Sequence, residues 1–326
     1  MTGLSDSFHR PINYFRISIT DRCNLRCIYC MPETGINLLH HSDILSYEEI
    51  YTIAKLSTEL GITKIRITGG EPLVRAGLPQ LIQLLKGIEA IDDLSITTNG
   101  ILLSDYALRL KQAGLDRVNV SLDTLKPNRF EALTRTNHKL TDVLKGIETA
   151  RKVGLKPVKI NTVVIKDIND DEIIDFAQQT ITHSWHVRFI ELMPVTTNNK
   201  HSFVSVDEMR KCIASLGRLE PYLSNIGNGP AKYYRLPKAR GTIGFIAPIS
   251  EHFCFKCNRL RLTSNGKLRP CLLSTNEIDI KQALRQHIPD RELKHIISEA
   301  VANKPLQYKL ENGLMLKDRP FSQVGG

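Results

Sequence analysis

The sequence predicts an α/β fold, a partial (β/α)6 barrel followed by a smaller α+β domain. Strand-like apolar runs alternate with helix-like runs through residues 14–192, which is typical of a parallel sheet with right-handed crossovers. Six such units fall short of the eight in a closed barrel, so we expect an open barrel. The alternation stops near residue 205, which predicts a barrel domain at residues 1–204 and a C-terminal domain at residues 205–326.

The expected strands are short and rich in β-branched residues, and several helix-like runs between them begin at Ser, Thr or Asn and end at Gly. The strands cover residues 14–20, 64–68, 94–98, 117–122, 158–164 and 186–192. Beyond residue 205 we expect one helix, several short strands joined by turns, and two further helices.

The composition is that of a globular enzyme, with 41% apolar and 24% charged residues among 326. No stretch approaches the ~20 apolar residues of a membrane span, and residues 1–15 lack the apolar centre of a signal peptide. We therefore expect a cytoplasmic protein with no membrane partner. The net charge of +10 is spread along the chain without a basic block, which favours a basic cavity for a small polyanion over a nucleic-acid tail.

Six of the seven cysteines fall into two tight groups, which in a reducing compartment indicates metal binding rather than disulfides. The groups are Cys23, Cys27 and Cys30, and Cys254, Cys257 and Cys271. Cys212 stands alone at a helical spacing with Met209 and Ile213, so we expect it to be a buried thiol.

The first group, with the spacing CxxxCxxC, suits a [4Fe–4S] cluster that leaves one iron open for another ligand. A zinc site would need a fourth donor, and His40 and His41 are the nearest candidates. The bacterial ferredoxin run has a different spacing and a fourth cysteine, so simple electron transfer fits less well.

The second group, CxxC followed by thirteen residues and a third cysteine, leaves a structural zinc site open as an alternative because His252 lies two residues before Cys254. Three arginines within the same loop, Arg259, Arg261 and Arg269, favour an open cluster with an anion beside it.

Glycine and polar residues lie at or just after the ends of the expected strands, with Asn161 inside the fifth, at the edge where parallel α/β folds build their sites. They are GGEP at 69–72, TTNG at 97–100, Ser121, Asp123, Asn161 and ELMP at 191–194. Loops after strands commonly contain such residues. Because a cysteine group follows the first strand at the same edge, we interpret them as one shared cavity.

CxxxCxxC after a first strand, with Tyr29 before the last cysteine and GGEP after the second strand, resembles the radical S-adenosylmethionine superfamily and its TIM-like partial barrel. The late CxxC-x13-C group, within NRLRLT and LRPCL, makes the chain resemble the GTP 3′,8-cyclases of molybdenum cofactor biosynthesis. The likeness covers nearly the whole chain, down to the terminal Gly325 and Gly326.

The resemblance implies a lyase with two [4Fe–4S] clusters and S-adenosylmethionine as cofactors. In the family, reductive cleavage of S-adenosylmethionine gives a radical that takes the 3′ hydrogen of GTP, and C3′ then attacks C8. The implied partners are GTP, a one-electron donor and the downstream cyclic pyranopterin monophosphate synthase, with no nucleic acid. A homodimer is left open.

The resemblance also assigns residues to roles. S-adenosylmethionine contacts are implied for Tyr29, Gly70, Ser121 and Met193, and catalytic roles for Arg16, Arg188, Gly325 and Gly326. GTP contacts are implied for Arg16, Arg66, Thr97, Lys159, Arg259, Leu260 and Arg261, and cluster ligation for the six grouped cysteines. The terminal glycines are expected to enter the cavity, although Pro320 departs from the family pattern.

Two alternatives remain open at this point. One is another two-cluster radical enzyme that modifies peptides, although such enzymes usually carry more C-terminal cysteines. The other is a zinc-stabilised, basic nucleic-acid-binding protein, for which the 6% aromatic content provides no stacking surface.

Overall fold

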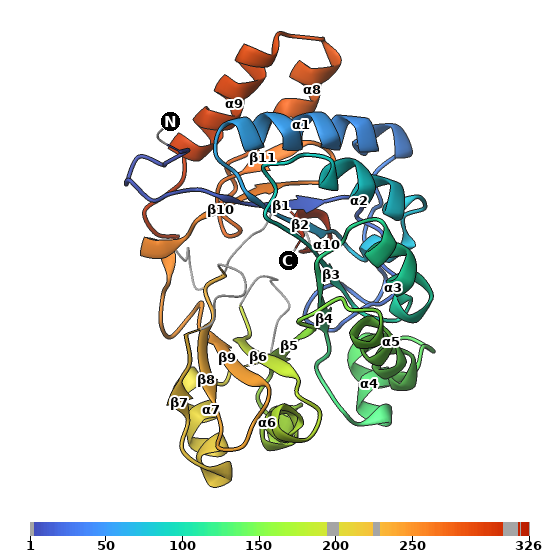
Figure 1. Cartoon of the computed structure of the whole chain (residues 1–326), viewed down its shortest axis with the longest axis vertical. Helices are drawn as coiled ribbons and strands as arrows, with labels where there is room; N and C mark the ends of the chain where they lie inside the picture. Colours follow the sequence, from blue (N-terminus) through green and yellow to red (C-terminus); the bar gives the residue numbers. More distant parts are fainter. Residues whose placement is uncertain (1–2, 194–201, 224–228, 309–318, 320, 326) are drawn as a thin grey trace.

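The computed structural model describes residues 3–193, 202–223, 229–308, 319 and 321–325, and in this part all strands join one twelve-stranded sheet (Figure 1). The strand order is β12-β11-β10-β1-β2-β3-β4-β5-β6-β9-β8-β7. The eight strands from β10 to β9 run parallel to one another and curve into an open barrel. The predicted partial barrel is therefore confirmed.

The first six strands lie within the expected segments or begin one residue before them. They are β1 (Tyr14–Ser18), β2 (Lys64–Thr68), β3 (Asp93–Thr98), β4 (Arg117–Ser121), β5 (Lys159–Val164) and β6 (His186–Glu191). The strands expected at 14–20, 117–122 and 186–192 end one or two residues early, where the chain turns into the loops of the carboxyl edge.

Helices cover the outer face of this sheet. They are α1 (Tyr47–Glu59), α2 (Leu78–Lys86), α3 (Leu103–Gln112), α4 (Pro127–Thr134), α5 (Leu140–Lys152) and α6 (Ile173–Thr182). α1 starts with a reciprocal capping box between Ser46 and Glu49. α4 starts with Pro127 in the first turn, where the missing N–H is tolerated.

The chain after residue 205 extends the same sheet at both ends. β9 (Thr242–Ile246) pairs with β6 in parallel, and β8 (Lys232–Arg235) and β7 (Glu220–Pro221) follow it outward. At the opposite end β10 (Arg259–Leu262) pairs with β1 in parallel, and β11 (Lys267–Arg269) and β12 (Ile278–Asp279) follow. The C-terminal segment thus supplies two strands to the parallel barrel.

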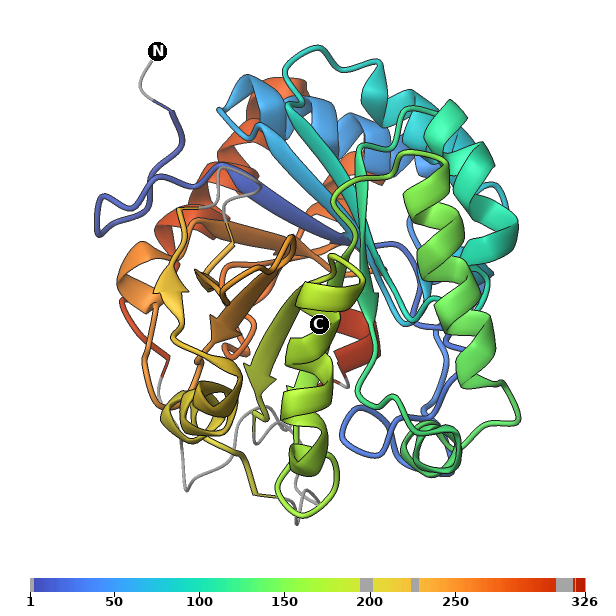
Figure 2. The ribbon, with the colours of Figure 1, turned by 60° about the horizontal axis from the view of Figure 1, so that its bottom comes forward.

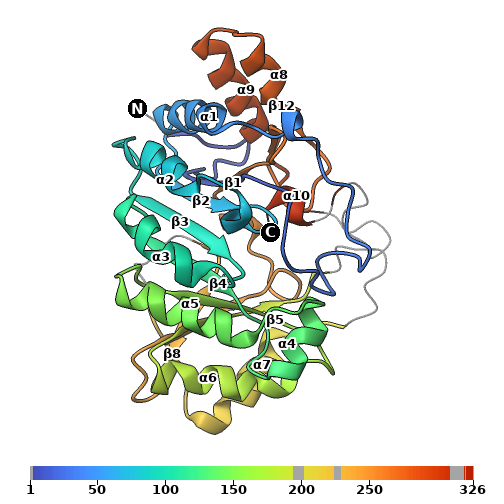
Figure 3. The same ribbon diagram turned by 90° about the vertical axis from the view of Figure 1, so that its right-hand side faces the viewer.

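The remaining helices flank these additions. α7 (Val206–Ile213) lies near β8, whereas α8 (Ile280–Arg285) and α9 (Asp290–Ala302) lie beside α1 (Figure 3). Single 3-10 turns occur at His41–Asp43, Pro72–Val74, Asp170–Glu172, Ala214–Leu216 and Cys254–Lys256. The last short helix, α10 (Phe321–Val324), lies inside the curve of the barrel (Figure 2).

Side chains alternate across the barrel strands, which fixes what lies inside. Outward residues such as Phe15, Ile65 and Ile96 are fully buried under the helices. Inward residues are polar, including Arg16 and Arg66, which pair in register and are also buried. Buried polar groups destabilise a fold unless they find partners, so the barrel interior is where a ligand belongs.

Two further observations concern the rest of the chain. Cys212 is exposed on α7, so the prediction of a buried thiol was wrong. The buried stripe of this helix runs through Val206, Met209 and Ile213, and Cys212 lies beside it.

In the part of the chain that the structure describes, no helix has the length and apolar character needed to cross a membrane.

Candidate active site

Two cavities lie inside the barrel, each lined by one cysteine group. The first cavity is lined by Cys23, Cys27 and Cys30, together with Tyr29, Gly70, Thr97, Ser121, Asp123 and Met193. The second cavity is lined by Cys254, Cys257 and Cys271, together with Tyr14, Arg16, Arg66, Arg188, Arg259 and Arg261. Asn161, Ile190 and Met193 line both cavities, so the two spaces adjoin.

The first cysteine loop is held by backbone hydrogen bonds. The amides of Arg26 and Ile28 donate to carbonyls in the last turn of α4, at 2.8 and 3.0 Å. The Cys30 amide donates to the Cys27 carbonyl at 2.9 Å, and the resulting turn places both cysteines in one tight loop. Burial raises the pKa of Cys23 to about 11 and of Cys30 to about 12. These thiols therefore need a bound metal to become thiolates, as cluster ligands do.

The GGEP loop packs directly on this cysteine loop. A Cβ on Gly70 would lie 2.4 Å from the Arg22 carbonyl oxygen, and one on Gly69 would lie 2.6 Å from the Thr20 carbonyl oxygen. Gly69 also has a φ of +150°. Only glycine permits this approach of two backbones at the edge of the first cavity.

Glu71 connects three loops at the same edge. Its fully buried carboxylate accepts hydrogen bonds from the Leu73 amide, from Thr98 Oγ1 at 2.8 Å and from the Asn99 amide at 2.6 Å. Asn99 Nδ2 in turn donates to Asn24 Oδ1 in the cysteine loop at 2.8 Å. Burial raises the pKa of Glu71 to about 7. The loops after β1, β2 and β3 therefore form one rigid rim.

Tyr29 is oriented by a residue to which sequence reasoning gave no role. Its hydroxyl donates to Asp123 Oδ2 at 2.7 Å, while Asp123 Oδ1 accepts from the Val163 amide at 2.8 Å. Burial raises the pKa of Asp123 to about 6. Asp123 had been noted only as a strand-end residue; its position two residues after Ser121 was the available signal.

The second cysteine loop is held by two buried cations that sequence reasoning missed. Lys304 Nζ donates to the carbonyls of Arg259, at 2.7 Å, and Pro270. Arg10 Nη1 donates to the Cys254 carbonyl at 2.7 Å. Burial acts to raise the pKa of Cys257, but Arg259 and Lys304 outweigh it and lower the pKa to about 6. No local sequence pattern distinguishes Lys304 or Arg10 from surface cations.

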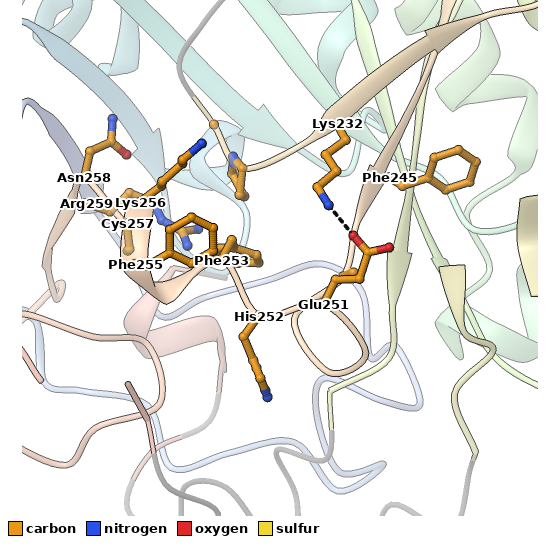
Figure 4. Close-up of a pocket in the computed structure, with 13 residues that line it drawn as sticks. Lys232, Phe245, Glu251, His252, Phe253, Phe255, Lys256, Cys257, Asn258 and Arg259 are labelled. Carbon is orange, nitrogen blue, oxygen red and sulfur yellow. Dashed lines mark hydrogen bonds and ion pairs between the residues drawn. The ribbon is translucent and has the colours of Figure 1, made fainter. Parts of the chain in front are cut away.

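The zinc alternative for the second group depended on His252, whose ring has other partners. His252 Nδ1 lies 3.0 Å from the Pro248 carbonyl oxygen and 2.9 Å from the Tyr308 hydroxyl. Figure 4 shows the ring pointing away from Cys257, in a third cavity that also contains Phe255 and an ion pair between Lys232 and Glu251. In the described ranges no three His, Cys, Asp or Glu side chains are grouped as one metal ion would require.

Positive charge is concentrated on the interior of the barrel. Arg16 lies beside Arg66 on one side and Arg261 on the other in the sheet register. Burial, together with the nearby arginines, lowers the pKa of Arg66 to about 9. No carboxylate in the described residues pairs with Arg66, Arg188, Arg259 or Arg261. This arrangement needs an anion.

Three of the residues that the resemblance assigns to GTP are not among those lining the second cavity, and their GTP contacts stay predictions. Thr97 lines the first cavity rather than the second. Lys159 lines neither cavity; its ammonium lies 3.1 Å from the Tyr233 hydroxyl, and burial together with neighbouring arginines lowers its pKa to about 6. The Leu260 side chain is fully buried in the core, so only its backbone is available to a ligand.

The end of the chain enters the barrel. The Gly325 carbonyl accepts hydrogen bonds from Arg261 Nη1 at 2.6 Å and from Arg16 Nη2 at 3.5 Å. Phe321 and Ser322 line the first cavity. Gly326 and Pro320 lie outside the described residues. The tail therefore lies beside both cavities, and its catalytic role stays a prediction.

Comparisons with known families and structures agree with this geometry. Residues 17–180 match the Radical SAM superfamily, and residues 185–310 match the family described as Molybdenum Cofactor Synthesis C. The fold is similar to that of SuiB from Streptococcus suis, solved with its precursor peptide SuiA, with a TM-score of 0.64 and 16% identity over 91% of this chain and 66% of that one. The fold and the first cysteine loop thus define a radical S-adenosylmethionine protein, a class that implies a [4Fe–4S] cluster and S-adenosylmethionine.

Curated relatives narrow the class. The chain is 50% identical to the GTP 3′,8-cyclase of Pelotomaculum thermopropionicum over 99% of this chain and 100% of the relative. It is 50% identical to that of Moorella thermoacetica and 51% identical to that of Thermodesulfovibrio yellowstonii, each over 99% of this chain and 100% of the relative. The chain belongs to the GTP 3′,8-cyclase family.

Proposed function

We propose that this protein is a lyase that converts GTP into 3′,8-cyclo-7,8-dihydro-GTP at the start of molybdenum cofactor biosynthesis. The observation that carries the proposal is the pair of adjoining cavities, each with three thiols, of which the second is lined by arginines. A radical source and a polyanionic nucleotide can be held next to each other in this arrangement. The relatives at about 50% identity support the same substrate.

In the first cavity, Cys23, Cys27 and Cys30 would hold a [4Fe–4S] cluster, leaving one iron for S-adenosylmethionine. When bound, the two together supply a radical that can remove a hydrogen atom from carbon. Tyr29 is fixed by Asp123, and the Gly70 backbone is held against the Arg22 carbonyl, where only a glycine fits. Such fixed groups reduce the reorganisation needed when a cofactor binds.

In the second cavity, Arg16, Arg66, Arg188, Arg259 and Arg261 would bind the triphosphate. GTP carries about four negative charges near neutral pH, and charge-assisted hydrogen bonds from guanidinium groups are stronger than neutral ones. The arginines are already fixed by the strands, so they are arranged before substrate arrives. The desolvation that lowers the pKa of Arg66 is relieved by a bound anion.

Cys254, Cys257 and Cys271 would hold a second [4Fe–4S] cluster beside the purine. The donor set fits: Arg259 and Lys304 lower the pKa of Cys257 and so favour the thiolate form that a cluster binds. Three ligands leave one corner of such a cluster available to a nitrogen of the base. Anchoring the base there, with the phosphates at the arginines, would fix the ribose between two points.

The ribose would then lie at the boundary of the two cavities. Asn161, Ile190 and Met193 form this shared wall. Two apolar side chains exclude water from the place where hydrogen leaves C3′ and the bond to C8 forms. Holding the reacting atoms close together contributes up to ~7–11 kcal/mol to a barrier of this kind.

The test is an anaerobic assay of the reconstituted, dithionite-reduced protein. With S-adenosylmethionine, 5′-deoxyadenosine should form only when GTP is present, together with the cyclised nucleotide. Iron analysis should give about eight irons per chain, as two [4Fe–4S] clusters require. One zinc with no sulfide, or 5′-deoxyadenosine formation that needs a peptide instead of GTP, would overturn the proposal.

The second cluster is tested separately with Cys257→Ala. This variant should lose cyclisation and bind GTP more weakly, but still support some cleavage of S-adenosylmethionine that is not coupled to cyclisation. Cys212→Ser is the matched control, because this exposed thiol is outside both cavities. Normal cyclisation by Cys257→Ala would exclude the proposed role.

The same proposal includes a one-electron donor and a cytoplasmic synthase that receives the product to make cyclic pyranopterin monophosphate. Both partners are implied by membership of the GTP 3′,8-cyclase family. Co-purification of the chain with each candidate partner, with and without GTP, would test direct binding.

A further inference from the structure

Tyr14 occupies a position in the second cavity that no motif assigned. It is the first residue of β1, and its side chain faces the barrel interior with 3% exposure. Its backbone is fixed, since its amide donates to the Asn258 carbonyl at 3.2 Å. The ring lies under the Arg66 guanidinium, 5.3 Å from the ring centre. The phenol is therefore a rigid part of the cavity wall.

The Tyr14 hydroxyl finds no hydrogen-bond acceptor in the described part of the protein, and the Arg16 guanidinium beside it can only donate. A buried hydroxyl without a partner destabilises a fold by about 1–3 kcal/mol. Burial acts to raise the pKa of Tyr14, but Arg66, Arg16, Arg117 and Arg188 outweigh it and lower the pKa. Guanidinium groups only donate hydrogen bonds, so these neighbours provide no acceptor for the phenol proton.

The missing acceptor has to come from a ligand, and its surroundings define the chemistry. The hydroxyl and the guanidinium groups of Arg16 and Arg66 line one cavity, and all of them can donate to the same group. A phosphate presents several negatively charged acceptor oxygens, whereas ribose hydroxyls and the purine carry no charge. The surrounding guanidinium groups also make the Tyr14 hydroxyl a stronger hydrogen-bond donor, because they lower its pKa.

We propose that the Tyr14 hydroxyl donates a hydrogen bond to a phosphate oxygen of GTP and is a further triphosphate-binding residue. This inference rests on the proposed function, because it takes GTP as the occupant of the second cavity. It also predicts that, in the absence of GTP, this hydroxyl lowers the free energy of unfolding of the protein.

The test is Tyr14→Phe in the reconstituted enzyme, which removes one oxygen atom and keeps the ring under Arg66. Affinity for GTP and for guanosine is measured anaerobically by calorimetry. GTP affinity should fall about 10- to 100-fold, as expected for a lost hydrogen bond to a charged group, and guanosine affinity should stay within about twofold. Tyr106→Phe, on α3 outside the barrel, is the matched control and should change neither.

A second measurement separates binding from a structural role. Without GTP, Tyr14→Phe should be at least as resistant to urea as the natural chain, because it removes an unsatisfied buried group. Unchanged GTP affinity, an equal loss for guanosine, or a clear loss of stability would each overturn the proposal. If the natural chain binds GTP without cyclising it, the proposed function fails while this inference stands.

Discussion

Replacing Gly325 with alanine would displace the last turn of the chain from the barrel. Gly325 has a φ of +74°, and an added Cβ would lie 2.0 Å from Thr68 Oγ1 and 3.4 Å from Ser18 Cβ. Both neighbours belong to central strands, so they have little freedom to move. The four-residue helix α10 and Gly325 belong to no strand of the sheet, so they are the part that must shift.

The magnitude follows from what the shift removes. A left-handed conformation costs a residue with a Cβ roughly 1–2 kcal/mol. Moving the tail also breaks the 2.6 Å hydrogen bond from Arg261 to the Gly325 carbonyl, and such a bond to a charged group contributes about 1.5–3 kcal/mol. If the tail acts in the reaction, as the family resemblance implies, the combined loss of about 2.5–5 kcal/mol should lower turnover about 10²- to 10⁴-fold, at 1.36 kcal/mol for each factor of ten.

The assay compares cyclisation of GTP by Gly325→Ala with that of Gly3→Ala, where an added Cβ meets nothing within 4 Å. Iron content and unfolding by urea should match the natural chain in both variants, because α10 is a terminal turn that no strand depends on. Turnover by Gly325→Ala within about twofold of the control would refute the reasoning, since it would show that the seated tail is not needed.

Three further predictions concern single side chains. The pKa of Lys159 is lowered to about 6 in the folded chain. Between about pH 6 and pH 10 the unfolded chain therefore binds one proton more at this residue than the folded chain. Because of this difference, the free energy of unfolding rises with pH across that window. Lys159→Met should therefore raise the free energy of unfolding most near pH 6 and least near pH 10; a gain independent of pH would contradict this. Glu71→Gln should destabilise the fold by about 1–3 kcal/mol in urea at pH 8, because its amide opposes the Asn99 amide, while Glu33→Gln at an exposed position should have no effect. Cys212→Ser should leave iron content and turnover unchanged, and a loss of iron would show that this thiol binds metal.

Periodicity predicted the six barrel units because their strands and helices are neighbours in the sequence. It did not predict that β9 and β10 would join the barrel beside β6 and β1. Pairing between strands so distant in the chain leaves no local pattern. α4 is short and begins at Pro127 directly after Lys126, a pair more typical of a loop, so its sequence gives little indication of a helix.

The sequence likewise indicated some residues of the candidate site and not others. Arg16 and Arg66 stood out because they interrupt apolar strands, and the structure brings both to one cavity. Lys304 gave no such indication, because its role depends on the carbonyls of Arg259, the first residue of β10, and of Pro270, which follows β11. Only the fold brings these carbonyls close to Lys304. Cys212 was misjudged because a helical spacing of three from Met209 reaches the edge of a buried face as easily as its centre.

The pairing of β10 with β1 and of β9 with β6 has a consequence for biosynthesis of the chain itself. On a ribosome that has released only residues 1–204, β1 and β6 each have a bare row of backbone donors and acceptors facing water, and such rows recruit other chains. In the complete chain β10 covers the edge of β1 and β9 covers the edge of β6. A premature stop would therefore yield insoluble material rather than a functional half-enzyme, and attempts to prepare the first cluster on an isolated N-terminal fragment should begin by supplying the missing edges.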